Sequence, residues 1–165
     1  MVLVGLGSNL GASSGIIQKA ITALHVFSRG EVRASGLWCT SPVDCPPDSA
    51  DFINAVVHFE PKRNVTAHSL LAGLKRLEQE FGRGEAYVKN APRMLDLDLL
   101  LFGELRMEEP DLTIPHPSAM ERRFVLAPAA EIIPDLVWPG TQMTIRDLLD
   151  GLVSDEVVQQ IDILK

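Results

Sequence analysis

Cysteine is scarce in this chain of 165 residues, which contains only Cys39 and Cys45. Two cysteines are too few for a disulfide framework, and the five residues between them fit no C-x-x-C metal-binding spacing. We therefore predict two free thiols in a reducing compartment. The opening MVLVGLG has no basic leader and reaches glycine after four residues, so we expect neither a signal peptide nor a membrane anchor. Together these absences predict a cytoplasmic protein.

Basic residues are also in the minority. The sequence has 15 lysines and arginines against 22 aspartates and glutamates, which gives a net charge of −7 and an isoelectric point of about 5.0. Proteins dedicated to nucleic acids or to anionic membranes need a basic face, so this charge argues against both kinds of partner. A small local basic pocket remains compatible with it.

The residues that are present are typical of one folded domain. Hydrophobic residues make up 46% of the chain and charged residues 22%, which argues against disorder. A chain of this length can bury a hydrophobic core without disulfides or a structural metal. No internal repeat, low-complexity tract or Gly/Ser linker divides the sequence. We therefore predict a single domain over residues 1–165.

Hydrophobic patterning in the first half predicts a strand, a helix and two further strands. Residues 2–7 form a short β run that ends in glycine, and residues 31–38 and 52–60 also have the composition of strands. Between the first two strands, apolar residues recur at helical spacing, and Ser13 or Ser14 is placed to cap that helix. The apolar positions of the helix are Ile17, Ala20, Ile21, Leu24 and Phe27.

The second half predicts a helix, a strand and a short final helix. Thr66 can cap the first of these helices, and Gly82 marks its end. A strand follows within residues 92–103, and a short helix is expected near residues 145–152. The order β-α-β-β-α-β with a C-terminal extension is the ferredoxin-like pattern, an α+β fold whose antiparallel sheet carries helices on one face. The apolar stripe of the longer helix comprises Leu70, Leu74, Leu77 and Phe81.

Two aspartates, Asp96 and Asp98, stand in the apolar stretch PRMLDLDLLLFG. Side chains alternate along a strand, so both carboxylates are expected on one face. Like charges this close repel unless a cation lies between them, and Mg²⁺ is often held by one or two carboxylates together with substrate phosphates. A half-buried strand with a solvated polar face is the alternative. The other face, turned toward the helices, is expected to carry Leu95, Leu97, Leu99 and Leu101.

Cationic residues flank the two aspartates: Arg83, Lys89 and Arg93 precede them, and Arg122 and Arg123 follow. Cations around a carboxylate pair in an acidic protein suggest a polyanion that is bound through both metal and guanidinium groups. Neutralisation of the aspartates or ordinary surface charge is the alternative, and it applies best to Lys89 and Arg123.

Three further features are compatible with a ligand site. The stretch GLGSNLG misses the G-x-G-x-x-G dinucleotide spacing, and we interpret it as a tight turn where glycine lets a ligand approach the backbone, with a purely structural turn as the alternative. His116, between two prolines, can present a ring nitrogen to a phosphate or ribose, or bond to backbone.

Asn54 is an amide in an apolar strand that must be paired. It can match the edge of a heterocycle between Phe52 and Phe124, or belong to a core network.

Several of these motifs together resemble a known family. GLGSNLG, FINAVV, E-x-x-F-G-R, APRMLDLDLLLFG, IPHP and ERRFVLAPAAEI occur in this order and span nearly the whole chain. The set resembles the 6-hydroxymethyl-7,8-dihydropterin pyrophosphokinases of folate biosynthesis. The resemblance implies a ferredoxin-like fold and the transfer of pyrophosphate from ATP to the pterin hydroxymethyl group with release of AMP. It also implies small-molecule substrates, and we expect a monomer.

The resemblance assigns roles to individual residues. Asp96 and Asp98 would hold two Mg²⁺ ions that bridge the ATP phosphates, and Arg83 and Arg93 would be catalytic arginines that face these phosphates. The implied ATP-binding residues are Glu78, Leu99, Leu112, Thr113, His116 and Arg122. The implied pterin-binding residues are Gly7, Thr40, Pro42, Val43, Phe52, Asn54 and Phe124, with the two phenylalanines on either side of the ring.

The sequence departs from well-known members of that family at several positions. Asn90 and Ala91 stand where many members carry Trp-Gly, Ser41 replaces a frequent proline, and Pro117 replaces a frequent tyrosine. These differences concern loop closure and adenine contacts rather than the metal centre. Two nucleoside-side positions also differ in charge from other members, namely Lys75 and Asp111.

Two other classes of function fit parts of the pattern. Polymerase-palm-like nucleotidyltransferases also place paired aspartates on a ferredoxin-like sheet, but the net charge of −7 disfavours a nucleic-acid substrate. A regulatory module could bind the same small molecules without turnover. Formation of AMP from ATP only in the presence of pterin distinguishes the three classes.

Overall fold

The computed structural model describes residues 1–41, 50–82 and 94–161. Its elements confirm most of the predicted order, and in β1, β4 and α4 one bound differs from the prediction by one residue. The strands are β1 (Val2–Ser8), β2 (Ser28–Ala34), β3 (Leu37–Thr40), β4 (Phe52–Pro61), β5 (Asp96–Phe102), β6 (Met107–Glu108), β7 (Thr113–Ile114) and β8 (Val158–Ile161). The α-helices are α1 (Ser13–Leu24), α2 (Ala67–Glu80), α3 (Arg123–Ile132) and α4 (Ile145–Gly151), and 3₁₀ turns occur at η1 (His25–Phe27) and η2 (Ala119–Glu121).

The central sheet is antiparallel and, within the described residues, contains six strands. Its order is β5-β1-β4-β3-β8, and β2 pairs with the other end of β4. The single strand predicted over residues 31–38 was wrong, because Ser35 and Gly36 separate β2 from β3. The Ser35 hydroxyl accepts a hydrogen bond from the Val56 amide (3.0 Å), so a side chain replaces a ladder partner where the strand breaks.

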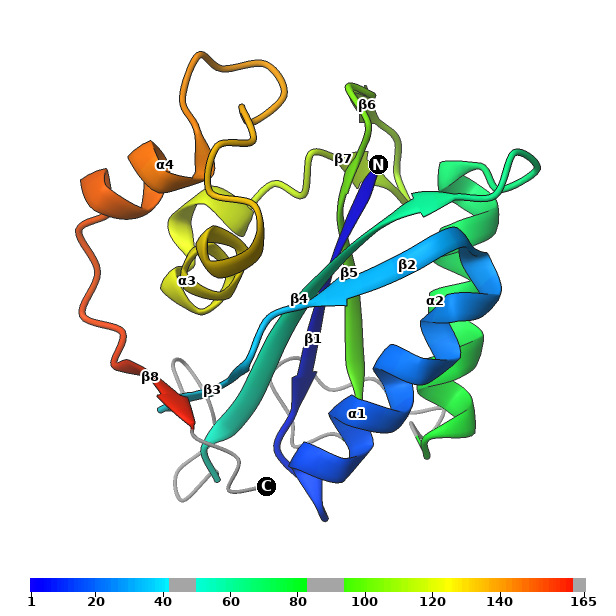
Figure 1. The fold of residues 1–165 in the computed structure, drawn as a ribbon, viewed down its shortest axis with the longest axis horizontal. Helices are drawn as coiled ribbons and strands as arrows, with labels where there is room; N and C mark the ends of the chain where they lie inside the picture. Colours follow the sequence, from blue (N-terminus) through cyan, green and yellow to red (C-terminus); the bar gives the residue numbers. More distant parts are fainter. Residues whose placement is uncertain (42–49, 83–93, 162–165) are drawn as a thin grey trace.

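Helices α1 and α2 cover one face of the sheet, as Figure 1 shows. The Thr66 cap of α2 is confirmed: Thr66 and Ser69 form a reciprocal capping box. The predicted cap of α1 was wrong, because the N-cap residue is Ala12, and Ser13 instead accepts a hydrogen bond from the Ser8 hydroxyl. The core between these helices and the sheet includes Val4, Leu6, Ile17, Leu24, Val57, Phe59, Leu70, Leu74, Leu97 and Leu99.

The C-terminal extension covers part of the opposite face of the sheet with α3 and α4 (Figure 1). The predicted short helix is confirmed as α4, whereas α3 was not anticipated. A second core lies between these helices and the strands, and it is centred on Trp138, which is 1% exposed. Its other buried members include Leu3, Val56, Leu100, Leu101, Val125, Leu126, Ala129 and Ile145.

A register shift in β5 decides which residues face each core. Val4 of β1 pairs with Leu99, but the preceding Leu3 pairs with Leu101, so Leu100 is an extra residue in the ladder. The prediction that Leu101 faces α1 and α2 was therefore wrong, since it belongs to the second core. Leu95, Leu97 and Leu99 face α1 and α2 as expected.

Candidate active site

A cleft of about 960 Å³ opens over the face of the sheet that carries α3 and extends around the edge strand β5 to α2. The structure brings most of the predicted site residues together in this cleft. It is lined by Gly7, Thr40, Phe52, Asn54, Glu78, Asp96, Asp98, Leu99, Leu112, Thr113, His116, Arg122 and Phe124. The other predicted residues lie outside the described part of the chain: Pro42, Val43, Arg83 and Arg93.

The two aspartates lie opposite glycines. In the ladder between β1 and β5, Asp98 pairs with Gly5 and Asp96 pairs with Gly7. Neither partner has a side chain, and neighbouring side chains approach both glycines: a Cβ atom would lie 3.5 Å from Leu100 at Gly5 and 3.2 Å from Asn54 at Gly7. Oxygen ligands on one face of a strand, next to open space, suit a hard cation that keeps several waters.

Glu78 connects α2 to the strand of the aspartates. Its side chain is 3% exposed, and its Oε1 accepts a hydrogen bond from the Leu97 amide (2.7 Å). Leu97 lies between the two aspartates in an edge strand, so this amide points away from β1 and takes its partner from the helix. Glu78 thereby fixes β5 against α2 at the position of the carboxylates.

His116 lies beside Arg122 and Asp96 in the cleft. Its backbone amide donates to the Leu100 carbonyl (2.9 Å), and its Nδ1 accepts from the Ser118 amide (3.3 Å). Burial, followed by the nearby Arg122 cation, holds the pKa of His116 below its ordinary value, against the opposing effect of Asp96. With Nδ1 acting as an acceptor, the neutral ring carries its proton on Nε2, so His116 is a hydrogen-bond donor there.

The end of the cleft over β4 combines an amide with aromatic rings, and it adjoins Asp96, because Asn54 and Asp96 pair with Gly7 from its two sides. Asn54 is 6% exposed, and its Nδ2 donates to the Thr40 hydroxyl (2.8 Å). A Cβ atom on Gly7 would come within 3.2 Å of Asn54 Oδ1, so glycine leaves room for the amide. Phe52 and Phe124 line the same cleft, and the Arg122 guanidinium lies 5.6 Å from the centre of the Phe124 ring. This end can match the edge and the faces of a planar heterocycle.

The cleft also contains charged residues beyond the predicted binding set: Lys75 and Asp111, which the resemblance placed on the nucleoside side, and Glu109 and Glu156, which the sequence did not single out. Lys75 precedes Glu78 by three positions, and this helical spacing could have indicated that both residues share one face of α2. Glu109 and Asp111 come from the hairpin between β6 and β7. Glu156 comes from the segment before β8, and no signal in the sequence connects it to the cleft.

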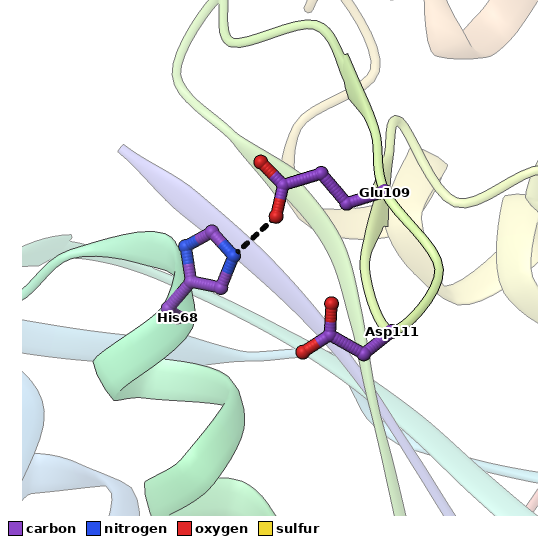
Figure 2. Close-up of side chains that lie close together, drawn as sticks. All are labelled: His68, Glu109 and Asp111. Atoms are coloured by element: carbon purple, nitrogen blue, oxygen red, sulfur yellow. Dashed lines mark hydrogen bonds and ion pairs between the residues drawn. The ribbon is translucent and has the colours of Figure 1, made fainter.

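One exposed group of side chains at the rim is drawn in Figure 2. His68 at the start of α2 faces Glu109 and Asp111 of the hairpin, and potential ligand atoms of the three lie within 4.8 Å of one another. His68 Nε2 is 2.8 Å from Glu109 Oε2. This contact joins the hairpin to α2 and accounts for the position of both side chains without a metal ion.

Comparison with known proteins agrees with this geometry. The family model of 7,8-dihydro-6-hydroxymethylpterin-pyrophosphokinase (HPPK) matches residues 3–134. The chain belongs to this family. A 2-amino-4-hydroxy-6-hydroxymethyldihydropteridine pyrophosphokinase of Synechocystis is 40% identical over 148 residues, which are 90% of this chain and 74% of the relative. The enzyme of the same name from Bacillus subtilis is 38% identical over 130 residues, which are 78% of this chain and 75% of the relative.

Solved structures of HPPK proteins share the fold. The chain superposes on an HPPK-DHPS structure from Plasmodium falciparum with a TM-score of 0.69 at 16% identity, over 90% of this chain. It spans 42% of that longer chain. Membership of the HPPK family confirms the family that the motifs resembled and supports a pyrophosphokinase activity in folate biosynthesis. Among the described helices, none combines the length and the apolar character that crossing a bilayer requires.

Proposed function

We propose that the cleft transfers pyrophosphate from ATP to the hydroxymethyl group of 6-hydroxymethyl-7,8-dihydropterin and releases AMP. Membership of the HPPK family supports this reaction. The observation that carries the proposal is the meeting of two chemistries in one cleft: the Asp96 and Asp98 carboxylates on β5, and the Asn54 amide on β4 together with the rings of Phe52 and Phe124. This arrangement suits a nucleotide and a planar heterocycle side by side.

The carboxylates of Asp96 and Asp98 would hold two Mg²⁺ ions. The donor set fits, because both residues offer oxygen atoms from one face of β5 and both line the cleft. When bound, these ions supply charge neutralisation along the triphosphate. Glu78 keeps the two aspartates in place through the Leu97 amide.

The ATP would lie along β5 and the β6–β7 hairpin. His116, with its proton on Nε2, and Arg122 offer hydrogen-bond donors to phosphate oxygens. Arg83 and Arg93 are proposed from the sequence to face the same phosphates. The nucleoside end would be bounded by Glu78, Leu99, Leu112 and Thr113, which line the cleft.

The pterin would occupy the Asn54 end of the cleft. Its ring would stack between Phe52 and Phe124. Asn54, whose Nδ2 already donates to the Thr40 hydroxyl, would present its amide oxygen and its second N–H to the edge of the heterocycle. Gly7 allows the ring to approach the backbone of β1. Pro42 and Val43 are proposed from the sequence to complete this pocket.

The reaction that follows is an in-line displacement. The hydroxymethyl oxygen loses its proton to solvent and forms a bond to the β-phosphorus of ATP, the bond between that phosphorus and the α–β bridging oxygen breaks, and AMP leaves with that oxygen. The protein contributes mainly alignment of the two substrates and stabilisation of the charge on the transferred group. Arg122 fits both tasks, since it lies beside His116 and over the Phe124 ring.

Formation of AMP tests this proposal. Purified protein is incubated with ATP and Mg²⁺, with and without 6-hydroxymethyl-7,8-dihydropterin, and AMP is measured. We expect AMP only when pterin is present, and no AMP when EDTA exceeds Mg²⁺. Binding of both substrates without AMP would instead identify a non-catalytic ligand-binding module. Nucleotide incorporation into DNA or RNA would identify a nucleotidyltransferase.

We further propose a ferredoxin-like core, a monomeric state and a cytoplasmic location. The sheet order β5-β1-β4-β3 and the two crossover helices α1 and α2 support the first. The acidic charge of −7 supports small-molecule substrates rather than nucleic acid. Within the described residues Cys39 has a free thiol, which supports a reducing compartment. Burial and Asp51 raise the pKa of this thiol. Cys45 lies outside the described residues.

A further inference from the structure

Helix α3 begins at the cleft, and its first residues form part of the wall. Arg122 is the N-cap residue, and Phe124 is the second residue of the helix. Both line the cleft, on either side of Arg123. No side chain at the N-cap position itself makes a capping hydrogen bond within the described structure. The direction of the first turn must therefore be set by another part of the chain.

The segment before β8 supplies the missing contact. Glu156 Oε2 accepts a hydrogen bond from the Arg123 amide at 2.6 Å, and the Arg123 guanidinium donates to the Leu152 carbonyl at 3.0 Å. Arg123 is thus held at its backbone and its side chain by residues about 30 positions later. A carboxylate at the first amide of a helix also interacts favourably with the helix dipole.

Glu156 is itself fixed on both sides. Its amide donates to the Ser154 hydroxyl (3.1 Å), and two residues later β8 begins to pair with β3. In that ladder Val158 pairs with Thr40, the residue that accepts the hydrogen bond of Asn54. The C-terminal segment therefore joins the Asn54 end of the cleft to the start of α3.

We propose that Glu156 is a positioning residue of the active site. Its carboxylate fixes the Arg123 amide, and through it the directions in which Arg122 and Phe124 leave the backbone. The inference rests on the proposed function, because its consequence is the placement of groups against pterin and ATP. Glu156 acts through Arg123.

A purely structural capping role is the competing explanation, and the chain offers a matched control for it. At the opposite end of α3, Glu131 accepts hydrogen bonds from the Gly36 amide (3.0 Å) and from Trp38 Nε1 (3.0 Å). Glu131 also joins α3 to β3 by a carboxylate, but it is not part of the cleft wall. A second control is Asp155, an exposed carboxylate next to Glu156 in the sequence.

The experiment compares Glu156→Ala, Glu156→Gln, Glu131→Ala and Asp155→Asn by KM for pterin, KM for ATP, kcat and Tm. A hydrogen bond to a charged group is lost in Glu156→Ala, so we expect its KM for pterin to rise about tenfold or more. Glu156→Gln retains an acceptor oxygen, so its KM for pterin should rise only about threefold. Glu131→Ala should lower Tm with both KM values unchanged, and Asp155→Asn should match the wild type.

Two results would overturn the proposal. One is an active Glu156→Ala protein whose KM values stay within twofold of the wild type. The other is a Glu156→Ala protein that shifts Tm and kinetics in the same way as Glu131→Ala, which would indicate capping alone. If Glu156→Ala does not fold, the KM of Glu156→Gln decides: a rise supports positioning, and no rise contradicts it. Failure of the proposed function is a separate result, since the wild-type protein would then form no AMP.

Discussion

Asp96 and Asp98 are two aspartates in a strand whose other residues are apolar. Each stands opposite a glycine of β1, Asp98 opposite Gly5 and Asp96 opposite Gly7. Between them, the hydrogen bond from the Leu97 amide to Glu78 holds β5 against α2. Both carboxylates line the cleft, where we propose that they bind the metal ions and phosphates of the substrate complex.

We expect Asp98→Ala to lower kcat by at least about 100-fold with little change in folding, because one of the two carboxylates for Mg²⁺ is removed. The measurement is AMP formation at saturating Mg²⁺, together with thermal unfolding. Glu104→Ala is the matched control, since it removes an exposed carboxylate just after the same strand. Near-normal turnover of Asp98→Ala would count against the assignment.

His116 predicts a specific dependence of stability on pH. Its folded-state pKa is lowered below 6.5 by burial and Arg122, so the neutral ring is favoured in the folded protein. Above pH 6.5 both states are neutral and the group adds no pH dependence. Below pH 6.5 the unfolded chain takes up a proton first, so the free energy of unfolding falls as the pH falls toward the folded-state pKa.

Urea unfolding of the wild type and of His116→Gln at a series of pH values checks this dependence. The variant should lose less stability than the wild type as the pH falls below 6.5. The pKa of His58 is also lowered, mainly by burial, so His58→Gln should flatten the same window and provides an independent comparison. Parallel curves for the wild type and His116→Gln would contradict the prediction.

At the scale of the elements, the packing of α2 depends on a glycine. A Cβ atom on Gly73 would lie 2.3 Å from Phe27 Cζ, so the helix contacts the aromatic ring through its backbone. A Cβ atom added to Gly15 in α1 would have no neighbour within 4 Å among the described residues. The two glycines therefore test packing and helix propensity separately.

We expect Gly73→Ala to lower the free energy of unfolding by about 1–3 kcal/mol, because the displaced Phe27 ring outweighs the gain in helix propensity. Gly15→Ala should raise it by up to about 1 kcal/mol, because only the propensity changes. Chemical denaturation of both variants measures these effects. A gain in stability for both would show that Phe27 moves aside without cost.

The sequence predicts an element when the interactions that form it are between residues close together in the chain. The Thr66 cap and the stripe of Leu70 and Leu74 are local patterns, and both were predicted correctly. The break at Ser35 depends on a hydrogen bond from Val56, twenty-one positions away, and no local pattern contains it. The cap of α1 at Ala12 was missed because the Ser13 hydroxyl is engaged by Ser8 rather than by the helix.

The candidate site follows the same logic. Asp96 and Asp98 were found because carboxylates are conspicuous in an apolar strand, and Asn54 was found for the same reason. Glu156 was missed because it stands in a polar segment where a glutamate is unremarkable, and only the pairing of β8 with β3 brings it to the cleft. Residues that contrast with their neighbours can be predicted, whereas residues that tertiary structure brings in cannot.

At the scale of the whole molecule, the two cores share one sheet. The second core fills the space between α3, α4 and the strands, and Trp138 is its largest fully buried side chain. Because Val56, Leu100 and Leu101 belong to this core, the C-terminal extension is part of the support of the cleft.

We expect Trp138→Ala to lower the free energy of unfolding by about 3–5 kcal/mol, since it leaves a large cavity in the second core. Val137→Ala is the control: Val137 is 46% exposed, so the change should stay within about 0.5 kcal/mol. Chemical denaturation with far-UV detection measures both. A small effect of Trp138→Ala would mean that the extension contributes little to the stability of the domain.

The extra residue at Leu100 gives β5 two different alternations of side chains. Up to Leu99 the odd-numbered positions point toward α1 and α2, but Phe102 points there after the shift. A deletion of Leu100 would remove the extra residue and restore regular alternation, so the carboxylates would stay in register with Gly5 and Gly7, and Leu101 and Phe102 would keep their partners Leu3 and Val2. Position 100 is therefore a place where β5 can lose one residue without moving the carboxylates or exchanging the faces of Leu101 and Phe102.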